Sequence, residues 1–547
     1  MKTAFSTAVG DLRAVHNRFD IDATARTMAC LTRLHGMPMR QGAALLAYHE
    51  TLLFVRAHPA NQALLTAVER ELRRLAAYMK LQRGQHLPAL LNEGLPFADT
   101  VTRFSHDGVR WLLSHPHCKV SIDHFAEPTA DLNAVLRLTL PSLERNETTA
   151  SLGNDDLLDA LHVRRGRRLA FLVSELGRLD AQPYVKDHLF DSLDLFIKVA
   201  PSDAAFSKAY NRLPGGPVFF QPDLLRQFDA RALMEHALPA QREQGAASRS
   251  RATLVLKNTM ALTSRETDPA TYLDEGSLRL YDLERGLSVA LFGMTASRQL
   301  PLESYVGFTL FKNGLPVAYG GAWVLGERAN FGMNIFEPYR GGESGYMMCQ
   351  VLRAYRQAFG VQYFEVDAHQ FGLDNPEGIA TGAFWFYYRY GFRPLSRPLA
   401  LLAQSEKDRL DRRKGYRSSE KILLRFTESN IGLNFGANVP AQLFDVTTRV
   451  GHMVRKLYTG DRVAAERDCV RLFMTRATLP RSLNEDECRV LVEVALIARA
   501  LEIDDAQGLQ MLASMVKTKP VDLYGYQKLL LAFFSQPRVA RWRAKPA

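Results

Sequence analysis

The hydrophobic pattern changes its period several times between residues 330 and 394. Apolar residues recur at spacings of three and four after residue 345, which predicts an amphipathic helix. A β-branched and aromatic run beginning at residue 361 predicts a strand. The predicted elements are a strand at 331–336, a turn at 337–345, a helix at 346–359, a strand at 361–368 and a helix at 381–390. This order predicts that the two strands are adjacent and parallel, and that they separate at their C-terminal ends.

The flanking regions show mostly helical periods, which predicts four parts. Residues 1–240 are expected to be a helical domain, 241–274 a linker, 275–426 a domain with a mixed sheet, and 427–547 a second helical domain. The N-terminal helices are predicted at 23–35, 41–58, 61–80, 96–113, 132–145, 155–179 and 185–199, with a short strand at 119–123. Strands are predicted at 278–281, 288–292, 305–311 and 318–324, followed after the central part by a helix at 400–412 and a closing strand at 421–426. The C-terminal helices are predicted at 443–458, 462–475 and 485–501, before a frayed basic tail that includes Arg538, Arg541, Trp542, Arg543 and Lys545.

Composition narrows the class of protein. The chain has 547 residues, 47% of them hydrophobic and 23% charged, and a formal net charge of +11, which suits acidic small molecules, a nucleic acid or a membrane surface. No block of like charge dominates, so nucleic-acid binding is disfavoured. Five scattered cysteines without a Cys-x-x-Cys pair disfavour zinc and favour reduced thiols. No signal pattern and no apolar run of about 20 residues is present, so we expect a cytoplasmic protein without a membrane span.

The turn at residues 340–345 has the composition of a phosphate-binding loop. Three glycines (Gly341, Gly342 and Gly345) let backbone N–H groups converge without obstruction by Cβ atoms. The helix that follows adds its unpaired N-terminal N–H groups and positive dipole end, and Arg340 adds a fixed charge. The alternative is an ordinary strand-to-helix turn that uses glycines for its geometry.

Two motifs in this region resemble the GNAT superfamily of acyl-CoA-dependent N-acyltransferases. The first is Arg340-Gly341-Gly342-Glu343-Ser344-Gly345, similar to the family's Arg/Gln-x-x-Gly-x-Gly/Ala turn. The second is Tyr387-Tyr388-Arg389-Tyr390-Gly391-Phe392, similar to its Tyr-x-x-x-Gly-Phe helix end. The resemblance covers about residues 275–426 and implies an α/β (α+β) fold with a GNAT-like mixed sheet.

The sequence departs from the family pattern at two places. Glu343 stands where the family's middle glycine usually sits, and a carboxylate there repels a pyrophosphate unless its side chain turns away. Ala380 stands where the family often has an asparagine, with Asn375 nearby. The residues that the resemblance implies for binding of the acyl-CoA donor are Arg340, Gly341, Gly342, Glu343, Ser344, Gly345 and Asn375.

The resemblance also implies a reaction. The turn would hold the pyrophosphate of acetyl-CoA or another acyl-CoA, and Tyr387 occupies the family's position for the acid that protonates the leaving thiolate. The base that accepts the amine proton is open among Glu337, Asp367 and His369, with Glu337 and Asp367 equal and His369 behind them. Tyr387 can alternatively be an aromatic core residue.

The expected function is transfer of an acyl group from a CoA thioester to an amine of unknown class, without a metal. An acyl carrier protein is an alternative donor. The main rival is a GNAT-like domain without catalysis that serves as a binding or scaffold module. A nucleophile-elbow hydrolase built on Ser344 is disfavoured, because Tyr346 stands where that motif requires glycine.

Overall fold

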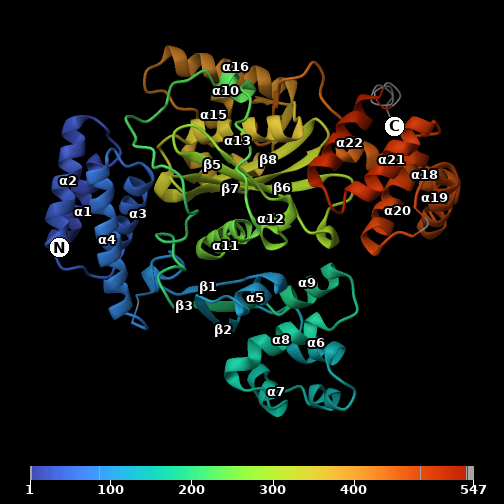
Figure 1. Ribbon diagram of the computed structural model, residues 1–547, viewed down its shortest axis with the longest axis horizontal. Coiled ribbons are helices and arrows are strands. Elements are labelled where there is room, and N and C mark those ends of the chain that lie inside the picture. Colours follow the sequence, from blue (N-terminus) through green and yellow to red (C-terminus); the bar gives the residue numbers. More distant parts are fainter. Residues whose placement is uncertain (1–2, 86, 481, 537–538, 540–547) are drawn as a thin grey trace.

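The computed structural model describes residues 3–85, 87–480, 482–536 and 539. It is a mixed α/β structure in which helical regions flank a central mixed sheet (Figure 1). The residues named in the predicted frayed tail, Arg538, Arg541, Trp542, Arg543 and Lys545, lie outside the described residues. Within the described part of the chain, no helix is long and apolar enough to cross a membrane.

The central sheet has eight strands in the order β10-β11-β9-β8-β7-β6-β5-β4. Their bounds are β4 (Arg279–Asp282), β5 (Leu287–Phe292), β6 (Ser304–Lys312), β7 (Leu315–Leu325), β8 (Arg328–Ile335), β9 (Tyr363–Val366), β10 (Arg393–Pro394) and β11 (Ile431–Asn434). Neighbouring strands of this sheet are antiparallel except β8 and β9, which are parallel. The prediction that these two strands are parallel neighbours is confirmed.

Both faces of this sheet are covered. Along β5 every residue is buried: Val289 and Leu291 belong to the core under α13 (Ser344–Phe359), and Ala290 and Phe292 to the core over α11 (Ala246–Thr263). Successive side chains of a strand point to opposite faces, so a strand buried on both sides reads as a continuous apolar run. In Figure 1, α13, α15 (Ala383–Arg389), α16 (Arg397–Arg412) and α10 (Ala230–Glu235) lie above the strands, and α11 and α12 (Asp268–Thr271) lie below them.

Helix α11 occupies much of the segment 241–274, which the sequence predicts to be a linker. Its C-terminal half is buried between two cores: Val255 and Leu256 face the central sheet, while Ala261 and Leu262 belong to the core of the lower unit, which is the part of the chain at residues 100–201. The polar first turns of the helix, around Arg249, obscure this periodicity.

An antiparallel bundle of four helices lies at the N-terminus, and its last three helices confirm those predicted at 23–35, 41–58 and 61–80. The helices are α1 (Ala4–Val15), α2 (Ile21–His35), α3 (Ala43–Ala57) and α4 (Gln62–Leu81). Asp20 and Asn61 accept backbone N–H groups in the first turns of α2 and α4, as side chains of N-cap residues do. Helix α3 packs against the short 3₁₀ helix Glu337–Tyr339 that follows β8, so the bundle contacts the glycine-rich turn.

The rest of the N-terminal region is not all-helical, which corrects the prediction. It holds a three-stranded sheet in the order β1-β3-β2 beside five helices. The strands are β1 (Thr100–Thr102), β2 (Cys118–Phe125) and β3 (Leu195–Pro201), and the helices are α5 (His106–Leu113), α6 (Leu132–Thr139), α7 (Asn154–Ala160), α8 (Arg168–Gly177) and α9 (Pro183–Ser192). The short strand predicted at 119–123 is confirmed within β2.

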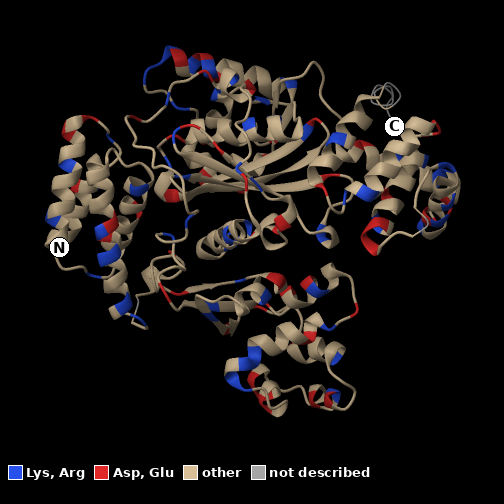
Figure 2. Ribbon diagram, viewed as in Figure 1, with Lys and Arg blue, Asp and Glu red and all other residues tan. Residues whose placement is uncertain are grey.

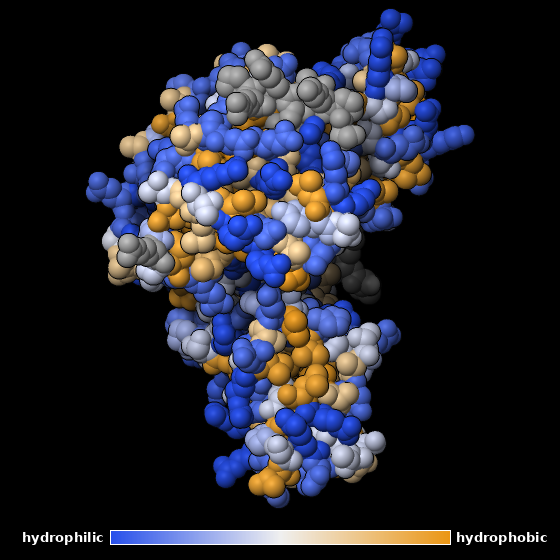
Figure 3. Space-filling model, turned by 90° about the vertical axis from the view of Figure 1, so that its right-hand side faces the viewer, coloured by the Kyte–Doolittle hydropathy of each residue, from blue (hydrophilic) through white to orange (hydrophobic). Residues whose placement is uncertain are grey.

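Three helices predicted in this unit are interrupted. The one at 185–199 ends at Ser192, because Asp194 adopts a φ of 45° and the chain then enters β3, in which alternate residues are buried. The one at 155–179 is broken near His162, at a φ of 55°, and the one at 96–113 begins only at His106. In Figure 3, a narrower waist separates this unit from the rest of the molecule, and hydrophobic residues gather on its surface.

The C-terminal region is a bundle whose last helix reaches the central sheet. Its helices are α18 (Leu443–Tyr458), α19 (Arg462–Arg476), α20 (Glu485–Ala500), α21 (Ala506–Thr518) and α22 (Leu523–Ser535). The three predicted helices are confirmed. The buried Gln527 amide of α22 donates to the carbonyls of Gly326, in the β7–β8 turn, and Phe359, at the end of α13, at 2.7 and 2.9 Å. Helix α22 therefore closes one end of the sheet.

The strand predicted at 421–426 is wrong. These residues form α17 (Glu420–Phe426), and the sheet is closed by β11 and β10 instead. Leu423 and Phe426 are buried three residues apart, which is a helical spacing.

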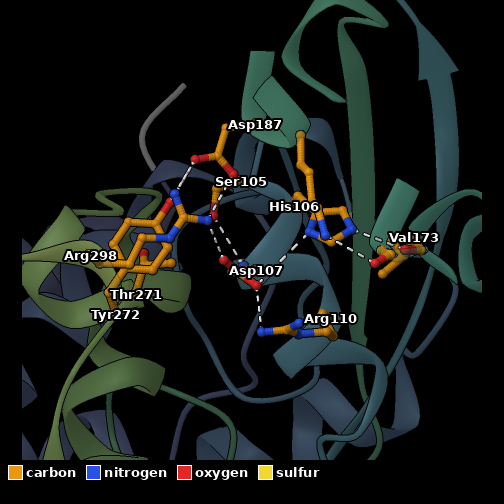
Figure 4. A network of polar contacts seen from close by, with 12 residues as sticks. Ser105, His106, Asp107, Arg110, Val173, Asp187, Thr271, Tyr272 and Arg298 are labelled. Atoms are coloured by element: carbon orange, nitrogen blue, oxygen red, sulfur yellow. Dashed lines mark hydrogen bonds and ion pairs between the residues drawn. The ribbon is translucent and has the colours of Figure 1, made fainter. Parts of the chain in front are cut away.

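A buried ion-pair cluster joins the lower unit to the central sheet (Figure 4). Arg298, after β5, binds Asp107 of α5 at 2.8 Å and Asp187 of α9, and its guanidinium lies 4.1 Å from the centre of the Tyr272 ring. Glu266 accepts both the backbone N–H and the hydroxyl of Ser105 at 2.7 Å. These charged contacts position the lower unit against α11 and α12.

Candidate functional site

The parallel strands β8 and β9 are paired over only part of their length. Their register runs from Arg328 opposite Tyr363 to Asn330 opposite Glu365, although β8 continues to Ile335. Beyond the paired part, Gln370 lies beside β8, since a Cβ atom on Gly332 would come 3.3 Å from the Gln370 amide nitrogen. The C-terminal part of β8 therefore leads into the glycine-rich turn without a hydrogen-bonded neighbour on the β9 side.

The turn after β8 leaves open space in front of its first glycine. Gly341 has a φ of 76°, and a Cβ atom built on it would meet nothing within 4 Å. Arg340 is exposed, donates from Nε to the Ile335 carbonyl at 3.1 Å and forms an ion pair with Glu377 of α14 (Pro376–Thr381). This pair connects the segments that follow the two parallel strands.

Glu343 lies in this turn, but its side chain is enclosed by the protein. Its carboxylate accepts from Lys312 Nζ and Arg285 Nε, each at 2.9 Å, and from the Leu225 backbone N–H at 3.0 Å. Its side chain and that of Lys312 are both 0% exposed. Glu343 therefore anchors the turn to β6 and to the segment around residue 225, and its charge does not face the space in front of the glycines.

Tyr390, which belongs to the second motif, contacts the turn. A Cβ atom on Gly345 would come 1.7 Å from its hydroxyl oxygen, so only glycine fits at residue 345. The Tyr390 ring stacks on Phe228 at 6.0 Å, and Phe228 meets Tyr346 edge-on at 5.5 Å. Three aromatic side chains thus form a wall beside the N-terminus of α13.

Tyr387 is buried in an aromatic cluster of α15. Its ring lies 5.5 Å from Phe392, 5.4 Å from Phe386 and 6.5 Å from Phe371. Burial raises the pKa of the Tyr387 phenol above its ordinary value. A phenol is already protonated at neutral pH at its ordinary pKa, so the upward shift makes Tyr387 a weaker proton donor.

The other predicted site residues after β9 have local structural contacts. Asp367 accepts the His369 backbone N–H at 3.0 Å, and Asn375 accepts that of Gly378 at the start of α14, also at 3.0 Å. His369 is exposed, and its Nδ1 lies 2.9 Å from the Leu373 carbonyl. If Nδ1 carries the proton and donates to that carbonyl, Nε2 remains available as an acceptor.

Glu337 lies in a different environment, a pocket of about 240 Å³ at the C-terminal end of β8. The wall is made by separate parts of the chain: α3, the loop after α4, the segment after β3, α11 and the ends of β7 and β8. Its charged lining residues are Glu50, Glu93, Lys208, Arg265, Glu337 and Arg340. The structure thus brings Glu337 and Arg340 together with four residues that the sequence did not single out.

The charges in this pocket influence one another across the cavity. Burial raises the pKa of Glu50, and the neighbouring Glu337 and Glu93 charges raise it further. Burial lowers the pKa of Lys208, although the charges of Glu93, Glu50 and Glu337 oppose that shift. The sequence carries no local signal for this grouping, because Glu50, Lys208 and Glu337 are far apart along the chain.

A larger groove of about 1360 Å³ lies between α14, α15, α16 and α17. Asn375 lines it, beside Trp385 and the cations Arg389, Arg393, Lys407 and Arg417. Acidic and basic residues are intermixed on α16 in Figure 2, and Lys407 pairs with Asp411 there. The groove does not contain the glycine-rich turn.

Comparisons with known proteins add no family to this description. Among the described residues, no group of three or more His, Cys, Asp or Glu side chains is arranged to hold a metal ion. No protein-family model, no curated protein and no solved structure matches the chain.

Proposed function

We propose that this protein is an acyltransferase that moves an acyl group from acetyl-CoA or another acyl-CoA to an amine. The observation that carries the proposal is the parallel pair β8–β9 within an otherwise antiparallel sheet, followed by the Arg340–Gly345 turn and the N-terminus of α13. Pairing ends before β8 does, and the first N–H groups of α13 have no acceptor within the helix. This arrangement suits a pyrophosphate at the turn.

The proposed reaction needs an attacking amine, an acid for the leaving thiolate and a base for the amine proton. The amine nitrogen attacks the thioester carbonyl, the new C–N bond forms, and the C–S bond breaks to release a thiolate. Tyr387, at the position that the resemblance implies for the acid, is the proposed donor of a proton to that thiolate. Glu337 is the favoured base, because it lines the pocket beside Arg340, whereas Asp367 caps a short helix and His369 lies on the exposed loop.

A non-catalytic binding or scaffold module is the second candidate, and a specific observation favours it. Tyr390 covers Gly345, Glu343 is engaged in buried ion pairs, and Arg340 is already paired with Glu377. Each of these contacts reduces what the turn has free to offer a pyrophosphate. The two candidates differ in a measurable way, namely CoA binding and turnover.

The test is calorimetric titration of the full chain with CoA and acetyl-CoA, together with mass spectrometry of ligands that copurify. Arg340→Ala should weaken CoA binding about 10- to 100-fold if the guanidinium meets phosphate. Arg397→Ala, an exposed arginine of α16, is the matched control and should leave the affinity unchanged. Glu377→Gln should preserve or strengthen binding, because it releases Arg340 from its competing partner.

The outcomes separate the candidates. No binding of CoA by the wild-type chain would reject a CoA donor, and acyl transfer from an acylated carrier protein would then be the remaining enzymatic form of the proposal. Failure of both donors would leave the scaffold function.

A further inference from the structure

The pocket at the end of β8 contains four charged side chains that form no hydrogen bond or ion pair with another described residue. Glu50, Glu93, Glu337 and Lys208 all line it, and none forms a side-chain hydrogen bond or an ion pair with another described residue. Glu50, Glu93 and Lys208 are also partly buried. Charged groups withdrawn from bulk water are costly unless a partner satisfies them. Their convergence on one cavity therefore indicates a ligand.

We propose that this pocket binds the acyl acceptor, and that the acceptor is a small zwitterionic amine such as a free amino acid. The inference rests on the proposed function only in naming the ligand as the acceptor. Three carboxylates on one pocket attract an ammonium group. Lys208 on the same pocket, with Arg265 at an exposed position on its lining, supplies the charge that an acidic group on the ligand requires.

Lys208 is held in place by the loop that carries Glu93. Its backbone N–H donates to the Gly94 carbonyl at 2.9 Å, and a Cβ atom on Gly94 would come 2.8 Å from Lys208 Cγ. Gly94 also has a φ of 67°, so a larger residue there would be strained and would displace the lysine stem. The ammonium and the Glu93 carboxylate are therefore presented by one packed unit.

The size of the pocket limits the ligand. A volume of about 240 Å³ is smaller than the roughly 300–1,000 Å³ usual for drug-sized ligands. A single amino acid or a compound of similar size and charge pattern suits it better than a folded protein segment. Because Glu337 lines the pocket, an ammonium bound there lies beside the favoured base.

The test uses the full chain and free amino acids, each titrated by calorimetry and by thermal shift, with and without CoA. The tightest-binding amino acid is then compared with its methyl ester, which lacks the carboxylate, and its N-acetyl derivative, which lacks the ammonium. Each derivative should bind about 10- to 100-fold more weakly than the free amino acid. This comparison needs no variant, so it stands even if a substitution disturbs folding.

Two variants assign the charges. Lys208→Met keeps the packed stem and should abolish the preference for the free acid over its methyl ester. Glu50→Gln should reduce the preference for the free amine over its N-acetyl derivative. Lys198→Met, which removes a lysine of β3 that pairs with Asp99, is the matched control and should leave both preferences intact.

Failure of this inference is distinguishable from failure of the proposed function. CoA binding without binding of any amino acid, in the presence or absence of CoA, would overturn the inference and leave acyl transfer standing. Equal binding of the free amino acid and its methyl ester would also overturn it. Amino-acid binding with the expected preferences in a chain that binds neither CoA nor an acylated carrier protein would support the zwitterion site and remove acyl transfer.

Discussion

Replacing Glu343 by glutamine removes one negative charge from an enclosed network while changing the side-chain volume little. The carboxylate accepts charge-assisted hydrogen bonds from Lys312 and Arg285, and a third hydrogen bond from the Leu225 backbone N–H. In the variant, a single amide oxygen replaces the two carboxylate oxygens: if it accepts from Arg285 and Leu225, the fully buried Lys312 ammonium keeps only the Arg285 carbonyl, at 2.7 Å, and if it accepts from Lys312, the other two donors lose their acceptor. The new amide NH₂ is a donor placed among donors.

The expected cost is about 3–5 kcal/mol, the usual result of removing one partner from a buried ion pair. A typical domain has a free energy of unfolding of roughly 5–15 kcal/mol, so the loss is a large fraction of the total. Glu377→Gln is the matched control, because it breaks the exposed pair with Arg340 and should cost less than about 1 kcal/mol.

Hydrogen exchange followed by mass spectrometry measures the loss of stability in the segments that contact Glu343. In Glu343→Gln, peptides that cover residues 219–228 and 340–350 should exchange much faster, whereas those from α20 and α21 should not change. Replacing both members with apolar residues, as in Lys312→Met with Glu343→Leu, should recover part of the protection, because no unpaired ammonium then remains on Lys312. Unchanged protection in Glu343→Gln, or a loss no larger than in Glu377→Gln, would refute the anchoring role.

Three further predictions follow from buried polar groups. Burial raises the pKa of Glu303 to about 7 from 4.5. The protonated side chain therefore stabilises the fold fully below the pKa that Glu303 has in the unfolded chain, and this stabilisation is lost as the pH rises through 7. Glu303→Gln should flatten the fall in melting temperature between about pH 5 and 8. Arg298→Met removes the cation that Asp187 and Asp107 share and leaves Asp107 with Arg110 alone, so it should lower stability by about 3–5 kcal/mol in denaturant unfolding, whereas Arg103→Met, at an exposed pair, should cost less than about 1 kcal/mol. Tyr387→Phe should lower the acyl-transfer rate by roughly 10²–10⁴ with CoA affinity preserved, and a full rate would exclude Tyr387 as the acid.

The elements nearest the glycine-rich turn were predictable because their signals are local. Helix α13 shows its apolar face in the spacing of its own residues, and β8 and β9 show theirs in β-branched and aromatic runs. The segment 421–426 carries a similarly apolar run but forms α17, because Leu423 and Phe426 pack on one helical face. The helix predicted at 185–199 is wrong for a related reason, since a turn at Asp194 divides one apolar stretch between a helix and a strand.

Only the part of the candidate site that lies within one short segment, the glycine-rich turn, was predictable from the sequence. Gly341, Gly342 and Gly345 indicate a turn that approaches something closely, and for Gly345 the structure identifies that neighbour as Tyr390. The buried contacts of Glu343 depend on a lysine of β6 and an arginine before it, so their pairing is a property of the folded sheet. The grouping of Glu50, Lys208 and Glu337 likewise exists only once the bundle, α11 and the sheet have packed together.

The contacts of Gln527 have a consequence for the order in which the protein can fold during its synthesis. The strands of the central sheet and α13 leave the ribosome long before α22, yet one α22 side chain satisfies carbonyls of both the β7–β8 turn and the end of α13. Leu531 and Phe534 of the same helix pack against Gly360 and Gly326. Until α22 emerges, this end of the nascent sheet must remain hydrated or be covered by a chaperone. The catalytic half of the proposed enzyme would therefore reach its final stability only after the C-terminal bundle has been translated.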